Sequence, residues 1–300
     1  VVILLTFLGT WERQKPVVRS TLAESFTQSF TVYKSRSFRL LMGIFIFGQG
    51  AADFVTGLAV YYVDDVLNAY GGGNFTILMG VILLSQFLGM LLFAPIMART
   101  SKKFPMLVGT PIRMLATVAM LFFSYEGASF TVILVLSFII GLGMAGCSTT
   151  IYAILADMAD VDELITSVNR PGICSGMATF IRKIATGFSS AIIGVLLAIV
   201  GYNELTASEG LRQAASVQTG IANVYVFAQL VLLALALVFA ALYPMGKREF
   251  GIIRREIARR KGEDSSAATE EEIAVCEKVT GFSYDRLWDI KNAVKLSNKK

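Results

Sequence analysis

Two groups of charged residues could do chemistry that a purely apolar segment could not. The first, which we call the acidic cluster, comprises Asp157, Asp160, Asp162 and Glu163. The second is the adjacent pair Arg182 and Lys183, near the middle of an apolar run of membrane length. A charge at mid-bilayer costs from about 3 to more than 10 kcal/mol, so it normally faces a bundle interior or a water-filled cavity. These charges predict ligand binding or ion pairing within a membrane.

Other apolar runs carry charges at similar depth. A rise of about 1.5 Å per residue places Lys183 about 16 Å from Gly172, near the midplane of a hydrocarbon core about 30 Å thick. Asp53 and Arg113 lie well inside their own runs. These three charged residues can therefore approach one central cavity. We predict that this substrate cavity is lined by Lys183, Asp53 and Arg113, together with Tyr152. Internal ion pairing is the alternative for Asp53 and Arg113, and Arg113 could also reach the cytoplasmic surface.

Arg182 and Lys183 cannot both point squarely at that cavity. Neighbours on a helix with 3.6 residues per turn point about 100° apart. Polar residues flank Lys183 (Thr179, Thr186, Ser189 and Ser190), which favours Lys183 for the cavity. We assign Arg182 to a structural ion pair, with a carboxylate such as Asp53 as one partner.

The composition indicates a membrane protein with several spans. The 300 residues are 55% hydrophobic and 16% charged, and the apolar residues come in runs of about 20, the length that crosses a bilayer. Residues 1–10 are expected to be the end of a truncated transmembrane helix, and residues 11–39 a central cytoplasmic loop. Residues 40–245 are predicted to form a six-helix transmembrane bundle, with helices over 40–63, 76–97, 105–124, 130–156, 172–200 and 221–245.

The loops define an orientation through their Lys and Arg content. Ten cations occupy the loops 11–39, 98–104 and 157–170, against one, Arg212, in the loops on the opposite side. Cytoplasmic loops carry the excess of Lys and Arg, so the first set of loops is predicted to be cytoplasmic. The tail, residues 246–300, follows on the same side. The net charge of +5 thus reflects topology rather than nucleic-acid binding.

Several kinds of chemistry are disfavoured. The sequence has no histidine, and its three cysteines, Cys147, Cys174 and Cys276, are far apart, so no metal site or cofactor is predicted here. The chain starts without Met and its first residues resemble the end of a hydrophobic segment. We therefore expect an N-terminal portion to be missing.

The tail contains two helix signals. Residues 247–262 place Phe250, Ile253 and Ile257 on one face among basic residues, which suits a helix on the anionic inner leaflet. Thr269 with Glu272 fits a capping box, and Gly281 fits a helix end. A last segment, with Leu287, Ile290 and Val294, could dock on the membrane domain. A loosely ordered solubilising tail is the alternative.

Three stretches resemble the glycoside-pentoside-hexuronide:cation symporters of the major facilitator superfamily, the melibiose-permease family. The main one is A-D-x-x-D-x-x-E-x-x-T at Ala156–Thr166, followed by an apolar run that contains Lys183 and ends at Gly201-Tyr202. The others are Phe7–Arg13, and Pro95 with Ser101-Lys102-Lys103. The sequence departs from the family twice. Arg170 comes one place later than the family's arginine, and Ser148 stands where a family member has Trp.

The resemblance implies the C-terminal half of a twelve-helix major facilitator fold in a bacterial-type cell membrane. Lys183 matches the family's intramembrane lysine, and Asp157, Asp160 and Glu163 match its cytoplasmic gate carboxylates. Their basic partners are expected to be Arg99, Lys102, Lys103 or Arg170. The implied partners are a sugar or glycoside, a coupling H⁺ or Na⁺, the bilayer and the missing N-terminal half, where the cation site is expected.

Three functions remain in competition. The leading hypothesis is half of a cation-coupled sugar transporter that works by alternating access. The alternative is a non-transporting membrane sensor or scaffold with a dry bundle and the tail as its output. An intramembrane enzyme is disfavoured, because only Lys183 with a nearby serine could serve as a catalytic dyad.

Overall fold

The computed structural model describes residues 22–68, 73–208 and 211–293, and six of its helices are long and apolar enough to cross a membrane. The chain is therefore a multi-pass membrane protein, and the predicted all-α, six-helix bundle is confirmed. The predicted truncated helix, residues 1–10, lies outside the described residues. The six helices are α3 (Arg36–Tyr61), α4 (Asn74–Arg99), α5 (Phe104–Leu121), α6 (Phe130–Thr166), α7 (Pro171–Val200) and α9 (Ala215–Leu242).

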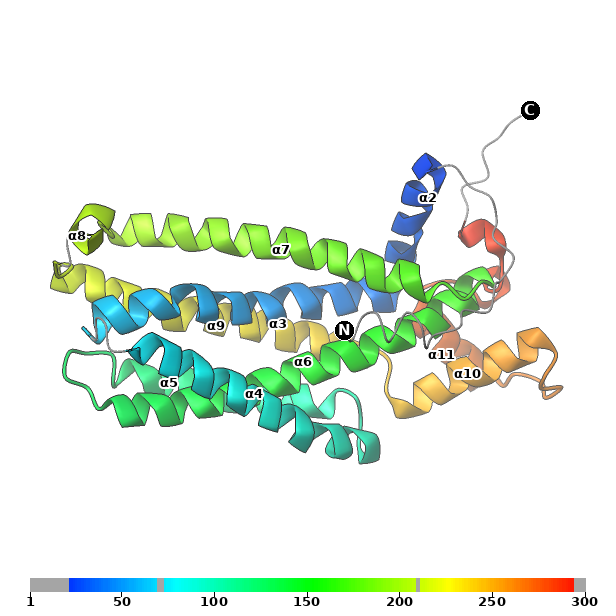
Figure 1. The fold of residues 1–300 in the computed structure, drawn as a ribbon. Helices are drawn as coiled ribbons and strands as arrows, with labels where there is room; N and C mark the ends of the chain where they lie inside the picture. The colour runs from blue at the N-terminus through cyan, green and yellow to red at the C-terminus, as the bar shows by residue number, and fades with distance from the viewer. Residues whose placement is uncertain (1–21, 69–72, 209–210, 294–300) are drawn as a thin grey trace, which may run out of the picture.

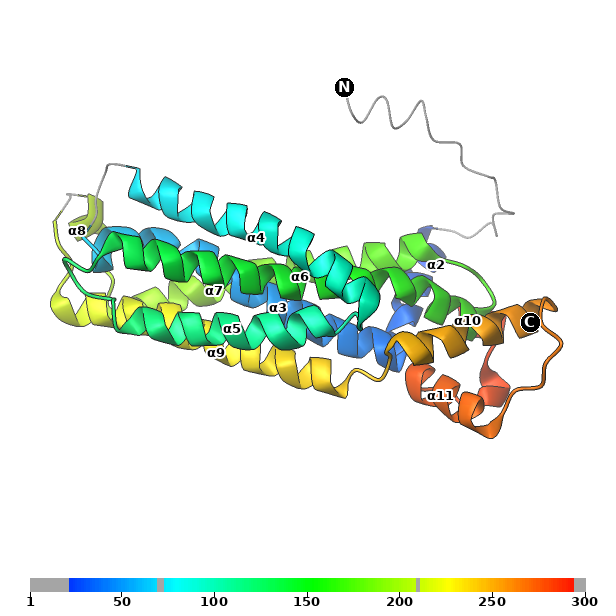
Figure 2. The ribbon, with the colours of Figure 1, turned by 90° about the horizontal axis from the view of Figure 1, so that it is seen from below.

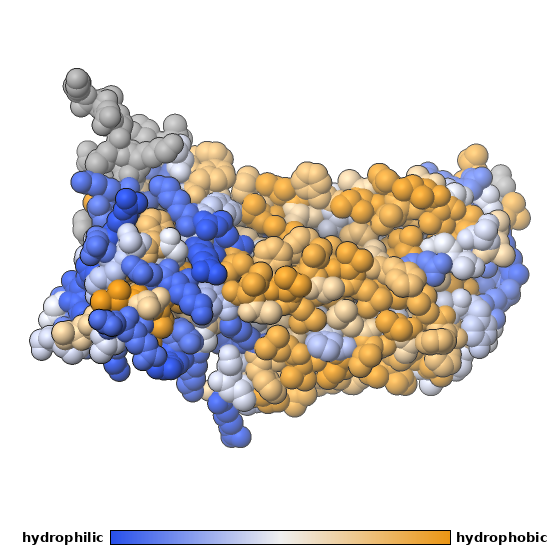
Figure 3. Space-filling model, turned by 180° about the vertical axis from the view of Figure 1, so that it is seen from behind, coloured by the Kyte–Doolittle hydropathy of each residue, from blue (hydrophilic) through white to orange (hydrophobic). Residues whose placement is uncertain are grey.

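The six helices run side by side along one axis (Figures 1 and 2). Helix α6 packs against both α4 and α5, and α3 packs against α9 and α7. Figures 1 and 2 place α7, α3, α6 and α4 towards one side of the bundle, with α5 and α9 on the other. The view from behind shows a broad apolar belt between two hydrophilic ends (Figure 3), as expected for a surface in contact with lipid.

Glycines on α6 let its neighbours approach closely. A Cβ added at Gly143 would lie 2.6 Å from the carbonyl oxygen of Gly109 on α5, and one at Gly141 would lie 2.5 Å from that of Ile82 on α4. Small residues at helix contacts allow such close backbone approach in membranes, where the hydrophobic effect does not drive helices together. The small residues of α6 thus fix its central position between α4 and α5.

The largest differences from the predicted helix boundaries are at the end of α6, at the start of α9, which begins at Ala215 rather than residue 221, and at the start of α3. Helix α3 begins at Arg36 rather than Leu40, because Ser35 caps it by accepting a hydrogen bond from the backbone N–H of Phe38. Helix α6 continues to Thr166 rather than ending near Ala156. Its 37 residues span about 55 Å, far more than the hydrocarbon core. The acidic cluster therefore lies on the last turns of a helix, not in a loop.

Short elements complete the described chain. Helix α2 (Leu22–Ser29) and the 3₁₀ turn η1 (Phe30–Lys34) precede α3, and a π-helical turn, η2 (Tyr62–Val66), extends it. Helix α8 (Glu204–Ser208) lies between α7 and α9. Four elements follow the bundle: α10 (Lys247–Lys261), α11 (Glu270–Thr280), η3 (Tyr284–Arg286) and η4 (Ile290–Asn292).

The tail folds against the end of the bundle that carries the acidic cluster instead of extending along the leaflet. Ile253 and Ile257 of α10 are buried in the same apolar cluster as Leu164 of α6, so the leaflet interpretation of this face was wrong. The interpretation as a loosely ordered tail was also wrong, because α11 has its predicted capping box. Leu287 is buried, whereas Ile290 is 47% exposed and Val294 lies outside the described residues.

Hydrogen bonds to backbone carbonyls hold the tail to α6 and α3. The N–H of Trp288 donates to the carbonyl of Leu164 at 2.8 Å, and the Asn292 amide donates to that of Ile165 at 2.9 Å. Ser37 on α3 donates to the carbonyl of Val279 at 2.6 Å. These carbonyls include two from the last turn of α6, which has no intrahelical donors for them.

The close packing of α6 and α5 gives a test. Gly143→Ala should lower the free energy of unfolding by about 1 to 3 kcal/mol, because the added methyl group meets backbone that must move. Gly187→Ala on α7 is the matched control, since its Cβ would meet nothing within 4 Å. Thermal unfolding in detergent measures both variants. Equal or raised stability in both would contradict the assigned packing.

Candidate functional site

Six polar side chains gather on one side of the bundle, and we call this group the polar face. Gln49 and Asp53 stand one turn apart on α3, as do Ser148 and Tyr152 on α6. Residues four apart share a helix face, so each pair is presented together. Gln86 of α4 and Arg182 of α7 join them. Contacts among these residues connect all four helices on this side.

An ion pair between Asp53 and Arg182 joins α3 to α7. Both terminal nitrogens of Arg182 donate to the Asp53 carboxylate, at 2.6 Å each. The hydroxyl of Thr186, one turn further along α7, accepts a third hydrogen bond from Arg182 at 2.6 Å. The two side chains keep 17% (Asp53) and 23% (Arg182) of their surface exposed. The pair is thus strong, oriented and accessible from the polar face.

Neutral hydrogen-bonding groups and an aromatic ring occupy the rest of the polar face. The amides of Gln49 and Gln86 both approach the Ser148 hydroxyl, at 3.5 and 3.4 Å. Tyr152 packs its ring edge-on against Phe45 and is 56% exposed. An aromatic surface beside a few directed polar groups is the usual construction of a small-molecule site.

Lys183 lies on α7 beside the polar face. It is exposed, and among the residues that the structure describes it has no hydrogen-bond or ion-pair partner. Helical spacing places it on a stripe with Ser175, Thr179 and Ser190, all exposed. A polar stripe of this kind at bilayer depth is unsuited to contact with lipid.

The structure places Arg113 in the interior of the bundle, away from the polar face. Its side chain is 1% exposed and donates to the Ala51 carbonyl at 2.9 Å and to the Gln229 side chain at 3.3 Å. These contacts connect α5 with α3 and α9. Of the residues predicted for the substrate cavity, the structure therefore brings Asp53 and Tyr152 to the polar face, places Lys183 beside it, and separates Arg113 from it.

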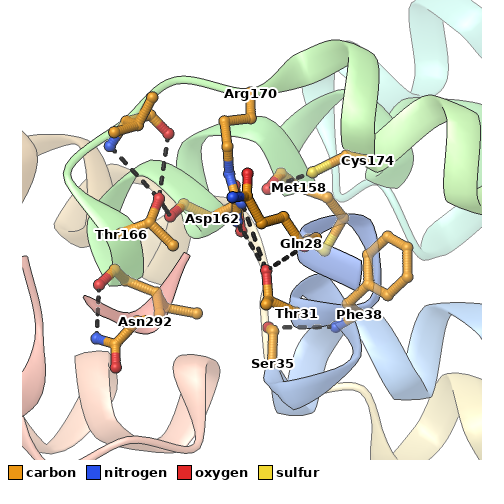
Figure 4. A network of polar contacts seen from close by, with 12 residues as sticks. Gln28, Thr31, Ser35, Phe38, Met158, Asp162, Thr166, Arg170, Cys174 and Asn292 are labelled. Carbon is orange, nitrogen blue, oxygen red and sulfur yellow. Dashed lines mark hydrogen bonds and ion pairs between the residues drawn. The ribbon is translucent and has the colours of Figure 1, made fainter. Parts of the chain in front are cut away.

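At the C-terminal end of α6, three carboxylates of the acidic cluster each pair with a cation from a different segment. Asp157 binds Lys102, from the loop between α4 and α5. Asp162 receives two bonds from Arg170, at 2.7 and 2.8 Å, and Arg170 also reaches the Thr31 hydroxyl (Figure 4). The shift of this arginine by one place therefore does not prevent its pairing.

The tail supplies the third cation. Lys261 of α10 binds Glu163 at 2.7 Å, and this hydrogen bond raises the pKa of Lys261. Asn169 donates to the same carboxylate at 2.7 Å. Asp160 and Glu163 line a polar pocket of about 610 Å³ together with Arg254 of α10.

Two of the cations predicted for the gate, Lys103 and Arg99, do not pair with the acidic cluster. Lys103 donates to the backbone carbonyl of Tyr243 and lies over its ring, joining the α4–α5 loop to the end of α9. Arg99 is exposed at the end of α4 and has no ion-pair partner among the described residues. Of the cations predicted to pair with the acidic cluster, Lys102 and Arg170 thus do so, and Lys261 is an additional partner.

Sequence reasoning missed Gln49, Gln86 and Lys261. The two glutamines stand inside apolar runs, where an uncharged amide gives a weak signal, although Gln49 precedes Asp53 by one helical turn. Lys261 is one of many basic residues in the tail. Only the packing of α10 on α6 distinguishes it from the others.

Comparison with known proteins now decides the family. A family model described as MFS/sugar transport protein matches residues 1–247, most of the chain. The chain belongs to this family. The resemblance drawn from the acidic cluster is therefore confirmed at the level of the major facilitator superfamily. The family contains transporters, and the six-helix bundle corresponds to one half of the major facilitator fold.

A curated relative adds detail. The chain is 30% identical over 214 residues to the glucuronide carrier protein homolog of Escherichia coli (strain K12). This match covers 69% of the chain and 44% of the relative. The chain therefore aligns with less than half the length of the protein that it matches.

The buried pair at the end of α6 can be tested. Asp162→Asn should lower the free energy of unfolding by about 3 to 5 kcal/mol, because it leaves the charge of Arg170 buried without its partner. The two side chains are only 7% and 10% exposed. The double variant Asp162→Asn with Arg170→Gln should recover part of this loss. Thermal unfolding in detergent is the measurement.

The control uses another carboxylate–arginine ion pair, one that is exposed to solvent. Glu126 and Arg212 pair at the opposite end of the bundle, where both are 53% exposed. Glu126→Gln should cost no more than about 1 kcal/mol, since exposed pairs contribute little. An equal loss in Glu126→Gln and Asp162→Asn would show that burial of the α6 pair does not matter.

Proposed function

We propose that this chain is the C-terminal half of a cation-coupled transporter of sugars or glycosides that works by alternating access. The polar face carries the proposal, because it presents an accessible ion pair, amides and an aromatic ring at bilayer depth. Such a surface cannot face lipid and suits the midplane site between two bundles. Membership of a sugar-transport family supports the same class of function.

The other half of the transporter is part of this proposal. The relative is more than twice as long as the segment it shares with this chain. A second six-helix bundle would cover the polar face and complete the site. We place the coupling cation, H⁺ or Na⁺, on that bundle, and the tail on the cytoplasmic side of a bacterial-type membrane. The excess of Lys and Arg in the loops on the tail's side supports this orientation.

The paired carboxylates at the end of α6 form the cytoplasmic gate in this mechanism. Their cations come from the α4–α5 loop, from the start of α7 and from α10. Rocking of the bundle moves these segments relative to the second half, so pairs can open and close as access alternates. The substrate class follows the relative, whose printed name refers to a glucuronide carrier.

A membrane sensor or scaffold is the second candidate. The folded tail favours it, because α10, α11 and the turns that follow form a compact unit on α6 that could transmit a signal. A sensor would not need the polar face. Uptake measurements therefore distinguish the two functions.

Substitution of Lys183 tests the proposed transport function. Lys183→Ala in the complete protein should reduce cation-driven uptake of a glycoside at least tenfold, since Lys183 reaches the central site. Uptake into proteoliposomes of a radiolabelled glycoside under an H⁺ or Na⁺ gradient is the measurement. Arg212→Ala, which removes an exposed cation at the opposite end, is the matched control. Wild-type uptake by Lys183→Ala would remove Lys183 from the site.

A further inference from the structure

We propose that a cavity between the end of α4 and the start of α10 binds the phosphate headgroup of an anionic phospholipid. Figures 1 and 2 both place these two segments side by side. The apolar spans of α4 and α9 end here, and the hydrophilic end of the bundle begins. The inference does not depend on the proposed transport function, because no residue of the polar face lines this cavity.

The cavity combines an apolar wall with a few polar groups. It has a volume of about 240 Å³, and its apolar lining includes Met97, Met245 and Phe250. The end of α4, the α4–α5 loop, α6 and the start of α10 contribute to it. Basic pockets at the membrane boundary recognise lipid headgroups through their charge. An apolar wall suits the glycerol and the first methylene groups that accompany a lipid phosphate.

The charges that line the cavity favour one negative charge on the ligand. They are Lys102, Lys247 and Asp157, two cations against one carboxylate. Asp157 pairs with Lys102, which leaves Lys247 without an ion-pair partner among the residues that the structure describes. The ammonium of Lys247 reaches only the Ala98 carbonyl, at 3.4 Å, and the residue is exposed. A phosphodiester carries the single negative charge that balances this site.

Lys102 can bind a phosphate oxygen without releasing Asp157. An ammonium group has three hydrogens to donate. One goes to Asp157 and a second, at 3.4 Å, to the carbonyl of Ala153. The ammonium lies 4.9 Å from the centre of the Phe250 ring, which holds it at the cavity wall, and the side chain is 37% exposed. The third hydrogen is therefore available to a ligand.

Tyr243 adds a hydroxyl that the protein itself leaves unused. Its side chain lines the cavity and is 1% exposed, yet the hydroxyl has no hydrogen-bond partner among the described residues. Burial, with the Asp157 carboxylate nearby, raises the pKa of Tyr243, so the hydroxyl keeps its proton. Leaving a buried hydroxyl unpaired destabilises a protein. A phosphate oxygen in the cavity would accept this hydrogen bond.

The surroundings favour a lipid over a soluble phosphate ester. The cavity is too small for acyl chains, but exposed apolar surface continues from it along α9, at Val238 and Leu242. Only the first turn of α10 meets the site, since the apolar face of this helix covers α6. The acid of that turn, Glu249, accepts a hydrogen bond from the Gly246 N–H at 2.8 Å and does not line the cavity.

Lipid titrations of the complete protein in detergent, followed by native mass spectrometry, test the proposal. The probes are palmitoyl-oleoyl phosphatidylglycerol, phosphatidylcholine with the same chains, and glycerol phosphate, which has no chains. The wild type should bind phosphatidylglycerol at least fivefold more tightly than phosphatidylcholine, because choline neutralises the phosphate. Glycerol phosphate should bind at least tenfold more weakly than phosphatidylglycerol, because it lacks the apolar contacts.

Two neighbouring cations give a matched pair of variants. Lys247→Gln should lower the affinity for phosphatidylglycerol at least fivefold and keep that for phosphatidylcholine within twofold. Arg248→Gln removes the same charge one residue further on, where the side chain is exposed, pairs with Glu271 and does not line the cavity. Its affinity for phosphatidylglycerol should stay within twofold of the wild type. Thermal unfolding without lipid confirms that each variant is folded.

Tyr243→Phe separates ligand binding from a structural role. It should lower the affinity for phosphatidylglycerol about threefold, because the donor is lost. Without lipid, its unfolding temperature should equal or exceed that of the wild type, because an unpartnered buried hydroxyl is removed. A lower unfolding temperature with unchanged lipid affinity would instead assign this hydroxyl to the fold.

Three further outcomes overturn the inference and leave the proposed transport function untouched. Equal affinity of the wild type for the two phospholipids would show that the cavity does not recognise the charge of the lipid. Equal losses in Lys247→Gln and Arg248→Gln would indicate diffuse attraction to a basic surface. Glycerol phosphate that binds as tightly as phosphatidylglycerol would make a soluble phosphate ester the ligand.

Discussion

The cost of placing a charge at bilayer depth is the constraint on which this structure depends. Each charged residue within the six spanning helices needs a partner or access to water. Asp53 and Arg182 meet that need with each other, across two helices, while remaining accessible from the polar face. Their pairing fixes which side of α7 turns towards α3. The polar stripe of α7 then lies beside the polar face, and its apolar residues turn towards lipid and α9.

The same constraint explains why Arg113 and Arg182 differ. Arg113 is enclosed by α3, α5 and α9 and bonds to a backbone carbonyl and an amide, neither of which carries charge. Its hydrogen bonds cannot be exchanged without opening the bundle, which suits a structural connection between three helices. Arg182 is bound to a full carboxylate and open to one side. Two arginines at similar depth thus have different physical environments and different capacities to bind a ligand.

The sequence predicts the helices well because each span is a long apolar run, and the bilayer requires such runs. It does not predict where α6 ends, since the acidic cluster looks like a loop when read as charged residues alone. Pairing with Lys102, Arg170 and Lys261 allows these carboxylates to remain on a helix. Those cations come from segments up to about a hundred residues away, and no local pattern encodes which of them meet. The basic face of α10 was misread for the same reason, because a basic amphipathic helix can cover either lipid or protein.

Helix α6 connects the tail to the polar face. Glu163 is held by Lys261, while the backbone N–H of Trp288 and the side-chain amide of Asn292 donate to the last carbonyls of α6. Helix α6 also carries Ser148 and Tyr152 on the polar face, three to four turns away along the same rigid element. A displacement of α6 at the polar face must therefore be accommodated at the tail, or resisted by it. In the transport mechanism proposed above, the tail therefore moves with the bundle, and its contacts with α6 contribute to the energy difference between the alternating conformations.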